Sequence, residues 1–199
     1  MIEIPVDLPA ELAPLSWLIG VWEGTGVIDY TGADHHYSGE FGHRVSFSHD
    51  GGPYLNYSAD AWAGEGDERA PLLAELGYWR LARPQTDADP GPGLLPPRTD
   101  GRTLTVDEVE ALRNDAGGFD IQAALVHADG MSELYLGQIR GPRIDIETDA
   151  VVRPATVKPY TAASRMYGLV EGHLLWAWDI AAVGGELASH ASARLAKVQ

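Results

Sequence analysis

The sequence predicts an all-β protein, a single antiparallel up-and-down β-barrel of about ten strands, similar in architecture to lipocalins and fatty-acid-binding proteins. Short runs that alternate apolar and polar residues recur along the chain, and the 23 Gly and 13 Pro are scattered between them. Alternation with a period of two is typical of strands that bury one face, and Gly and Pro mark the turns. A chain of 199 residues suits one such barrel, so we expect a single domain over residues 1–199.

The expected strands follow one another along the chain and pair with their sequence neighbours. Turn sequences at Ala128-Asp129-Gly130 and Glu171-Gly172 favour this up-and-down order. Ahead of the strands, Asp7 and Pro9 stand as a cap residue and a first-turn proline, which predicts a short helical turn. In chain order the strands are expected at residues 22–30, 45–49, 54–61, 76–81, 119–127, 132–139, 143–148, 163–170, 174–181 and 187–197.

Residues 83–118 interrupt the strand pattern with a segment rich in Pro, Gly and Asp. This composition excludes a strand, and the segment is too long for an ordinary hairpin loop. Val106, Val109 and Leu112 within it have helical spacing and predict one or two helical turns. We expect the segment to be a mobile insertion that the barrel does not need.

Charge and composition exclude several classes of function. The chain has 14 Lys+Arg against 29 Asp+Glu, a net charge of −15, which repels nucleic acid and anionic membrane surfaces. The absence of Cys excludes disulfides, thiolate nucleophiles and iron–sulfur clusters, so any metal must be bound by His or carboxylate. The N-terminal residues lack the basic start and apolar run of a signal peptide, which favours a cytoplasmic location.

The candidate ligands are the histidines, most of which we expect to be structural. Adjacent His35 and His36 would point to opposite faces of a strand and do not form a metal site by themselves. The sequence contains no zinc-hydrolase or serine-hydrolase motif. The seven histidines are His35, His36, His43, His49, His127, His173 and His190.

The glycine-rich run from Gly20 to Gly26 superficially suggests a phosphate loop, but it lacks the following Lys-Ser/Thr and does not lead into a helix. A small barrel explains it better. Trp22 is large enough to plug the closed end of the barrel, while Gly20, Gly24 and Gly26 let the strand bend and its neighbours approach closely.

This Gly-x-Trp-x-Gly-x-Gly run resembles the signature of the nitrobindin family of β-barrels. Further motifs similar to those of the family follow in the same order and cover nearly the whole chain outside residues 83–118. They are Phe47-Ser48-His49 with Pro53-Tyr54-Leu55-Asn56-Tyr57, Glu75-Leu76-Gly77-Tyr78-Trp79-Arg80, the spaced set His127, Gly130, Glu133 and Gly137, Lys158 with Arg165 and Tyr167, and the run from Ala182 to His190 followed by Ala193 and Leu195.

The resemblance implies that one ferric haem b per chain lies in the open mouth of the barrel, with its iron bound by His190 and the other side of the iron open. The residues themselves are compatible, because Ala188 and Ser192, two positions away on the expected strand, are small and leave room for a flat macrocycle. Taken without the resemblance, His190 is more simply explained as a histidine on a solvated edge. Ligation also requires a neutral imidazole, whose other ring nitrogen is usually held by a carbonyl or carboxylate that the sequence does not identify.

The resemblance also implies cofactor contacts from Lys158 and from Thr31, His35 and His36. Here the sequence departs from the family pattern. The stretch from Tyr30 to His36 is longer and more polar than the family's loop over the haem, and Leu73 stands where many members have a histidine. Either a hydrogen-bond donor near the pocket is missing, or His35 or His36 supplies it.

Nitrobindins bind NO at ferric iron and are regarded as isomerising peroxynitrite to nitrate. The leading hypothesis is therefore a haem-dependent peroxynitrite isomerase that acts on small molecules and scavenges reactive nitrogen species. Two alternatives remain, a carrier of a fatty acid or other apolar ligand and a sensor of haem or NO without turnover, because a fold does not decide function. The resemblance also allows a homodimer.

Overall fold

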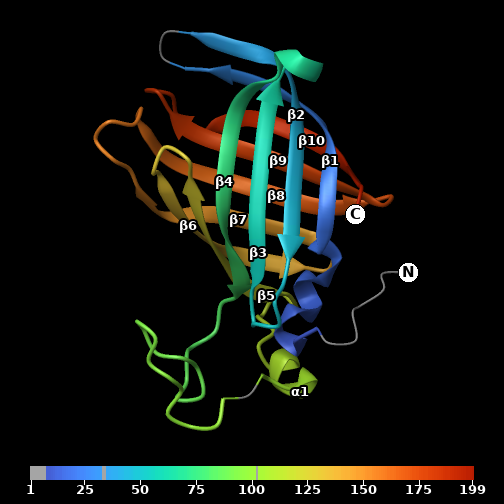
Figure 1. Ribbon diagram of the computed structural model, residues 1–199, viewed down its shortest axis with the longest axis vertical. Coiled ribbons are helices and arrows are strands. Elements are labelled where there is room, and N and C mark those ends of the chain that lie inside the picture. The colour runs from blue at the N-terminus through green and yellow to red at the C-terminus, as the bar shows by residue number, and fades with distance from the viewer. Residues whose placement is uncertain (1–7, 33–34, 102) are drawn as a thin grey trace.

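The computed structural model describes residues 8–32, 35–101 and 103–199. Within these ranges, ten antiparallel strands close into one barrel in which sequence neighbours pair and the last strand pairs with the first (Figure 1). The fold class and the up-and-down order predicted from the sequence are confirmed. The strands are β1 (Gly20–Thr31), β2 (His36–Ser48), β3 (Leu55–Ala63), β4 (Ala70–Leu81), β5 (Phe119–His127), β6 (Ser132–Arg140), β7 (Arg143–Val152), β8 (Tyr160–Val170), β9 (His173–Ala182) and β10 (Ala188–Lys197).

Some strands are longer than the sequence pattern predicted. The first five residues of β2, from His36 to Glu40, are all exposed, and so are the first three of β4, from Ala70 to Leu72. A strand segment without a buried face has no alternation of apolar and polar residues, so the pattern could not detect these ends.

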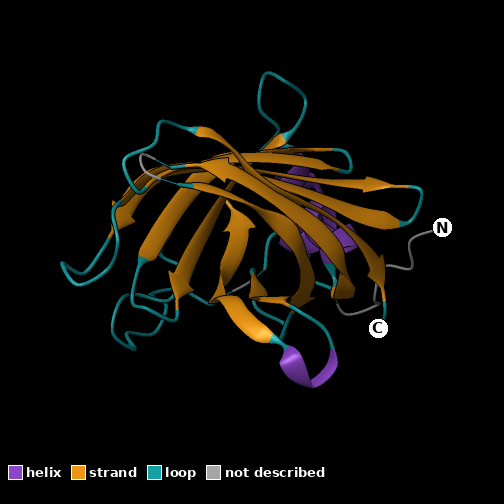
Figure 2. Ribbon diagram, turned by 90° about the horizontal axis from the view of Figure 1, so that it is seen from above, coloured by secondary structure: helices purple, strands orange, loops and turns teal. Residues whose placement is uncertain are grey.

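A 3-10 helix, η1 (Ala10–Leu18), closes the lower end of the barrel in Figure 1. Leu12, Leu15 and Leu18 are fully buried against the core at this end. The helical turn expected near the N-terminus is thus present, although Asp7 lies outside the described residues. Seen from above, the strands enclose one interior (Figure 2), and a second short 3-10 helix, η2 (Gly66–Glu68), connects β3 to β4.

Trp22 packs at the closed end, where it is 2% exposed and its indole N–H donates to the Leu18 carbonyl at 2.7 Å. The nearby glycines allow β10 to approach β1. A Cβ atom on Gly24 would lie 2.3 Å from the Arg194 carbonyl oxygen, and one on Gly26 would lie 2.5 Å from the Phe41 ring. Side chains at these two positions would therefore push neighbouring elements apart.

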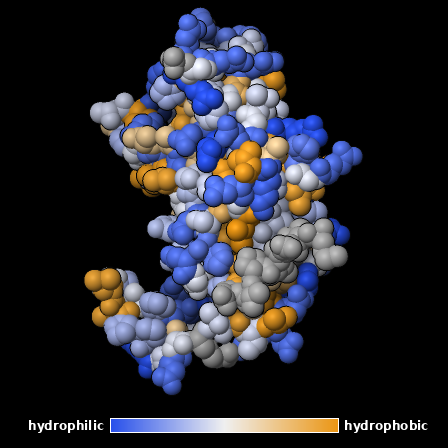
Figure 3. Space-filling view, turned by 45° about the vertical axis from the view of Figure 1, so that its right-hand side comes forward, coloured by the Kyte–Doolittle hydropathy of each residue, from blue (hydrophilic) through white to orange (hydrophobic). Residues whose placement is uncertain are grey.

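The insertion is anchored to the barrel at its two ends. Arg83, just after β4, contacts Glu11 of η1 at 3.0 Å and Asp89 at 2.7 Å. Near the other end, the short helix α1 (Val106–Glu110) begins with a capping box and places Val109, 3% exposed, in the core. The chain between these anchors projects from the barrel (Figure 1, Figure 3), and Leu94 is fully exposed there. The mobility of the segment stays a prediction.

We predict that residues 90–97 can be replaced by two glycines with a change in unfolding free energy of about 0.5 kcal/mol or less, because most of this chain is solvated. Val109→Ala, in contrast, should destabilise the barrel by about 2 kcal/mol because it leaves a cavity. Urea unfolding of both variants tests this. Loss of cooperative unfolding in the loop variant would show that residues 90–97 belong to the folded core.

Trp22→Ala should lower the unfolding free energy by about 3–5 kcal/mol, because it removes a fully packed indole and leaves the cavity unfilled. The matched control is Trp62→Ala, since Trp62 is only partly buried and stacks on Arg69 at the surface. Urea titrations of the two variants compare them directly. Equal stability of the Trp22 and Trp62 variants would contradict the role of Trp22 at the closed end.

Candidate functional site

His190 lies near the start of β10, at the end of the barrel opposite η1. The register of β10 against β9 shifts between Ser189 and Ala191, so His190 is the extra residue of a β-bulge. The bulge turns its ring toward the interior, where it meets Trp178 at 5.5 Å and Tyr30 at 5.2 Å between ring centroids. The argument from alternation was therefore wrong in one respect: Ser192 is exposed, whereas His190 is partly buried.

The surroundings of His190 keep its ring neutral. Burial lowers the pKa of His190 below its ordinary value of 6.5. The Nδ1 atom is buried, and in the described part of the chain nothing forms a hydrogen bond with it. The carbonyl or carboxylate that usually holds a ligating histidine is thus not supplied by these residues. A neutral imidazole can bind a metal through one ring nitrogen, and with Nδ1 buried this leaves Nε2 for a group that is not part of the chain.

The turn between β9 and β10 positions the bulge. Val183 has a φ of 44°, which a β-branched residue rarely adopts, and its N–H donates to the Pro159 carbonyl at 2.9 Å. The Tyr30 hydroxyl donates to the Ala182 carbonyl at 2.9 Å and accepts from the Ala182 N–H at 3.2 Å. These bonds join β1, the β7–β8 connection (segment 153–159) and β9 just where the chain enters β10.

The other cofactor contacts implied by the family resemblance lie at the same end of the barrel but are exposed. Thr31 and His36 share a hydrogen bond of 3.1 Å, and His36 lies 3.7 Å from Asp29. The His35 ring contacts that of Tyr37, with centroids 5.4 Å apart. Lys158 is exposed beside Pro159.

Thr31 and His36 thus contact each other and not His190. Ala33 and Asp34 of the same loop lie outside the described residues, and Leu73 packs against the core. Roles for Thr31, His35, His36 and Lys158 in cofactor binding stay predictions.

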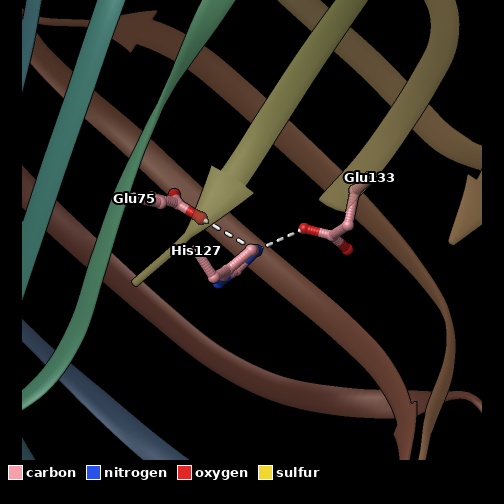
Figure 4. Close-up of side chains that lie close together, drawn as sticks. All are labelled: Glu75, His127 and Glu133. Atoms are coloured by element: carbon pink, nitrogen blue, oxygen red, sulfur yellow. Dashed lines mark hydrogen bonds and ion pairs between the residues drawn. The ribbon is translucent and has the colours of Figure 1, made fainter. Parts of the chain in front are cut away.

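A cluster of charged side chains occupies the barrel interior, contributed by β4, β5, β6 and β8. Arg165 forms a bidentate pair with Glu75 at 2.7 and 2.9 Å and lies 3.3 Å from Glu133. His127 lies between the two carboxylates, with Nε2 2.7 Å from Glu133 and 3.5 Å from Glu75 (Figure 4). All four residues are buried.

Three tyrosine hydroxyls complete the hydrogen bonding of this cluster. Tyr57 donates to Glu75 at 2.6 Å, whereas Tyr135 and Tyr160 donate to Glu133 at 2.7 and 2.6 Å. Burial alone would raise the pKa of Glu75, but the charge and hydrogen bonds of Arg165 outweigh it and lower the pKa to about 2. Burial alone would lower the pKa of Arg165, but the charge of the neighbouring Glu75 outweighs it and raises this pKa well above its ordinary value.

The same cluster has the composition of a metal site. One ligand atom each from Glu75, His127 and Glu133 lie within 4.8 Å of one another. Arg165, however, already holds both carboxylates, and its fixed positive charge repels a cation at that place. We interpret the cluster as a buried ion-pair network.

The family-like motifs include these four residues, but the sequence does not predict that they meet. A signal was present, because Glu133, Tyr135 and Ile139 share one parity along β6, and a carboxylate among buried neighbours indicates a buried partner. Of the remaining histidines, His43 is buried, hydrogen-bonded to the Asp60 carbonyl at 2.9 Å and packed on Trp176. His173 is near Arg194, at 3.1 Å.

Among the described residues, no helix is long and apolar enough to cross a membrane. A closed antiparallel barrel with a partly buried histidine, whose Nδ1 has no partner among the described residues, at the end opposite η1 defines a class of small barrels suited to holding a prosthetic group. A family model described as "THAP4-like, heme-binding beta-barrel domain" matches residues 11–197. The chain belongs to this family, which confirms the nitrobindin resemblance.

Individual relatives match along their full length. The chain is 63% identical over 202 aligned residues to a peroxynitrite isomerase of Leifsonia xyli subsp. xyli, with 100% of both chains covered. It is 59% identical to a peroxynitrite isomerase of Clavibacter michiganensis subsp. michiganensis, again with 100% of both covered. The crystal structure of Rv2717c from M. tuberculosis superposes with a TM-score of 0.69 at 26% identity, covering 97% of this chain and 100% of that one.

The buried carboxylates predict loss of stability in acid. Because the pKa of Glu75 falls from 4.5 to about 2 on folding, its ionised form contributes stability that is present above pH 4.5 and lost as the pH falls toward 2. Urea unfolding at several pH values measures this loss. The loss of stability with falling pH should be shallower in Glu75→Gln, which is itself destabilised because Arg165 is left without its partner. It should be unchanged in the control Glu147→Gln, which alters an exposed site. Identical acid profiles in all three proteins would contradict the assignment.

Proposed function

We propose that this chain is a haem-dependent peroxynitrite isomerase that holds one ferric haem b through His190 and also binds NO at the iron. The observation that carries the proposal is the full-length similarity to proteins named peroxynitrite isomerase, at 63%, 59% and 57% identity, in a haem-binding family. A homodimer and a cytoplasmic location stay predictions.

The residues present fit a haem group. Iron ligation requires a neutral imidazole, and burial lowers the pKa of His190 and so favours its neutral form. Its Nδ1 is buried, which leaves Nε2 as the nitrogen that would bind the iron. The chain has no Cys, so a thiolate ligand is not available. His190 also follows the turn from β9 to β10, and Ala182 at the start of that turn is hydrogen-bonded to Tyr30 of β1, which suits a ligand that must hold its position.

When bound, ferric haem supplies a Lewis-acidic, redox-active iron at which the O–O bond of peroxynitrite can break and the fragments recombine as nitrate. This is an isomerisation, so the chain need not supply or remove a proton. The chain would contribute His190 as the residue that holds the iron. Tyr30 and Trp178, both buried, pack edge-to-face against the imidazole. We expect Lys158, exposed at the same end, to contact the carboxylates of the cofactor.

His190→Ala should leave a folded barrel, with a change in unfolding free energy of about 1 kcal/mol or less, because its buried Nδ1 has no hydrogen bond to the described residues that the change would remove. It should abolish the five-coordinate ferric spectrum after hemin addition and the decay of peroxynitrite in stopped flow. External imidazole should partly restore both by occupying the vacated space.

The matched control is His173→Ala, since His173 lies at the opposite end of the barrel and should not affect either measurement. An unaltered haem spectrum in His190→Ala, together with its loss in a variant of His35, His36 or His127, would overturn the assignment of His190. Failure of the wild-type chain to take up hemin would instead favour the carrier of an apolar ligand.

A further inference from the structure

We propose that Trp178 is a positioning residue for His190, and that Arg165 fixes the indole from the buried ion cluster. The inference rests on the proposed role of His190 as the iron ligand. Trp178 contacts both partners, with the Arg165 guanidinium 4.3 Å from its ring centroid and the His190 ring at 5.5 Å. It thus connects the ion cluster to the candidate ligand.

His190 depends on ring contacts for its orientation. In most ligating histidines the second ring nitrogen donates to a carbonyl or carboxylate, which fixes the plane of the ring. His190 has no such bond to the described residues. Its contacts are two edge-to-face pairs, with Trp178 at an interplanar angle of 81° and with Tyr30 at 85°. Two perpendicular neighbours restrict rotation of the imidazole in place of a hydrogen bond.

The β-bulge makes this restriction necessary. At a bulge the extra residue is unpaired in the ladder, so its side chain is directed less firmly than in a regular strand. Tyr30 forms one side of the clamp, and its own ring is fixed by two hydrogen bonds to Ala182. Trp178 forms the other side, but its indole N–H has no partner in the described part of the chain. The indole must therefore be held by other contacts.

The ion cluster provides these contacts. The Arg165 guanidinium lies over the indole ring, an arrangement favoured by cation–π attraction. The His127 ring is stacked on the same indole at an interplanar angle of 24°. Arg165 is in turn fixed by its bidentate bonds to Glu75 and by the Tyr135 hydroxyl at 2.9 Å. The cation over the ring thus belongs to a rigid network, and it holds the indole against His190.

The test compares Trp178→Leu and Trp178→Phe with Trp176→Leu in the full-length chain. Trp176 is a matched control, because it is buried on the same strand face, its indole nitrogen also has no partner among the described residues, and it packs on His43 at 4.8 Å. It also packs on the Trp178 ring at 5.8 Å, so its removal loosens the packing of Trp178 without removing the ring that contacts His190. Three quantities are measured: the hemin dissociation constant, the ferric absorption and EPR spectra, and the NMR line widths of the His190 ring in the haem-free protein. Urea unfolding of each variant separates loss of fold from loss of positioning.

Trp178→Leu should raise the hemin dissociation constant by about 10- to 100-fold, the range seen when a group that orients a metal ligand is removed. It should also give a mixed ferric spectrum and broaden the ring signals of His190. Trp176→Leu should lose comparable stability without these changes, and Trp178→Phe should recover most of the affinity because it keeps an edge-to-face partner. Equal hemin affinity in Trp178→Leu and Trp176→Leu would contradict the positioning role and show that Trp178 contributes only to core packing.

His190→Ala distinguishes failure of this inference from failure of the proposed function. If His190→Ala keeps its hemin affinity, the ligand assignment itself is wrong. If it loses affinity while Trp178→Leu behaves as wild type, only the positioning role is wrong. Should Trp178→Leu not fold, Arg165→Lys, which keeps the charge but not the planar stacked group, must broaden the His190 signals for the proposal to stand.

Discussion

The bidentate ion pair between Arg165 and Glu75 is the interaction on which the barrel interior depends. It crosses the barrel from β8 to β4, which are not neighbours in the sheet. Two such charges buried without further partners would cost more than their attraction returns. The other carboxylate oxygens and guanidinium N–H groups of the cluster are therefore hydrogen-bonded by His127, Glu133 and tyrosine hydroxyls. The network holds together only as a unit, which makes this part of the interior rigid.

The rest of the candidate site follows from that rigidity. The ends of the barrel differ in chemistry, since η1 closes one with leucine side chains and the other carries His190. Between the ion cluster and His190 lies Trp178, an apolar ring that separates buried charge from a neutral imidazole. This separation leaves burial as the cause that lowers the pKa of His190.

Much of the architecture could be predicted because it depends on local patterns. Alternation located the strands with a buried face, and glycine-containing turns indicated that neighbours pair. The exposed ends of β2 and β4 were missed for the same reason, since they have no buried face to produce alternation. Glu75, His127, Glu133 and Arg165 were singled out as parts of family motifs, but their mutual contacts depend on barrel closure, which brings together residues up to 90 positions apart.

His190 shows what could be predicted from the sequence and what required the tertiary structure. The sequence by itself determined the all-β class, the order of the strands and the exclusion of thiolate ligands. Through the resemblance to the family motifs, it also led to the prediction that His190 is the ligand among the histidines. Only the tertiary structure showed that Ala188 and Ser192 do not share the face of His190, because a β-bulge has no signature in the alternation pattern. The two partners of that ring lie on other strands, Tyr30 on β1 and Trp178 on β9. Only closure of the barrel brings all three side chains together.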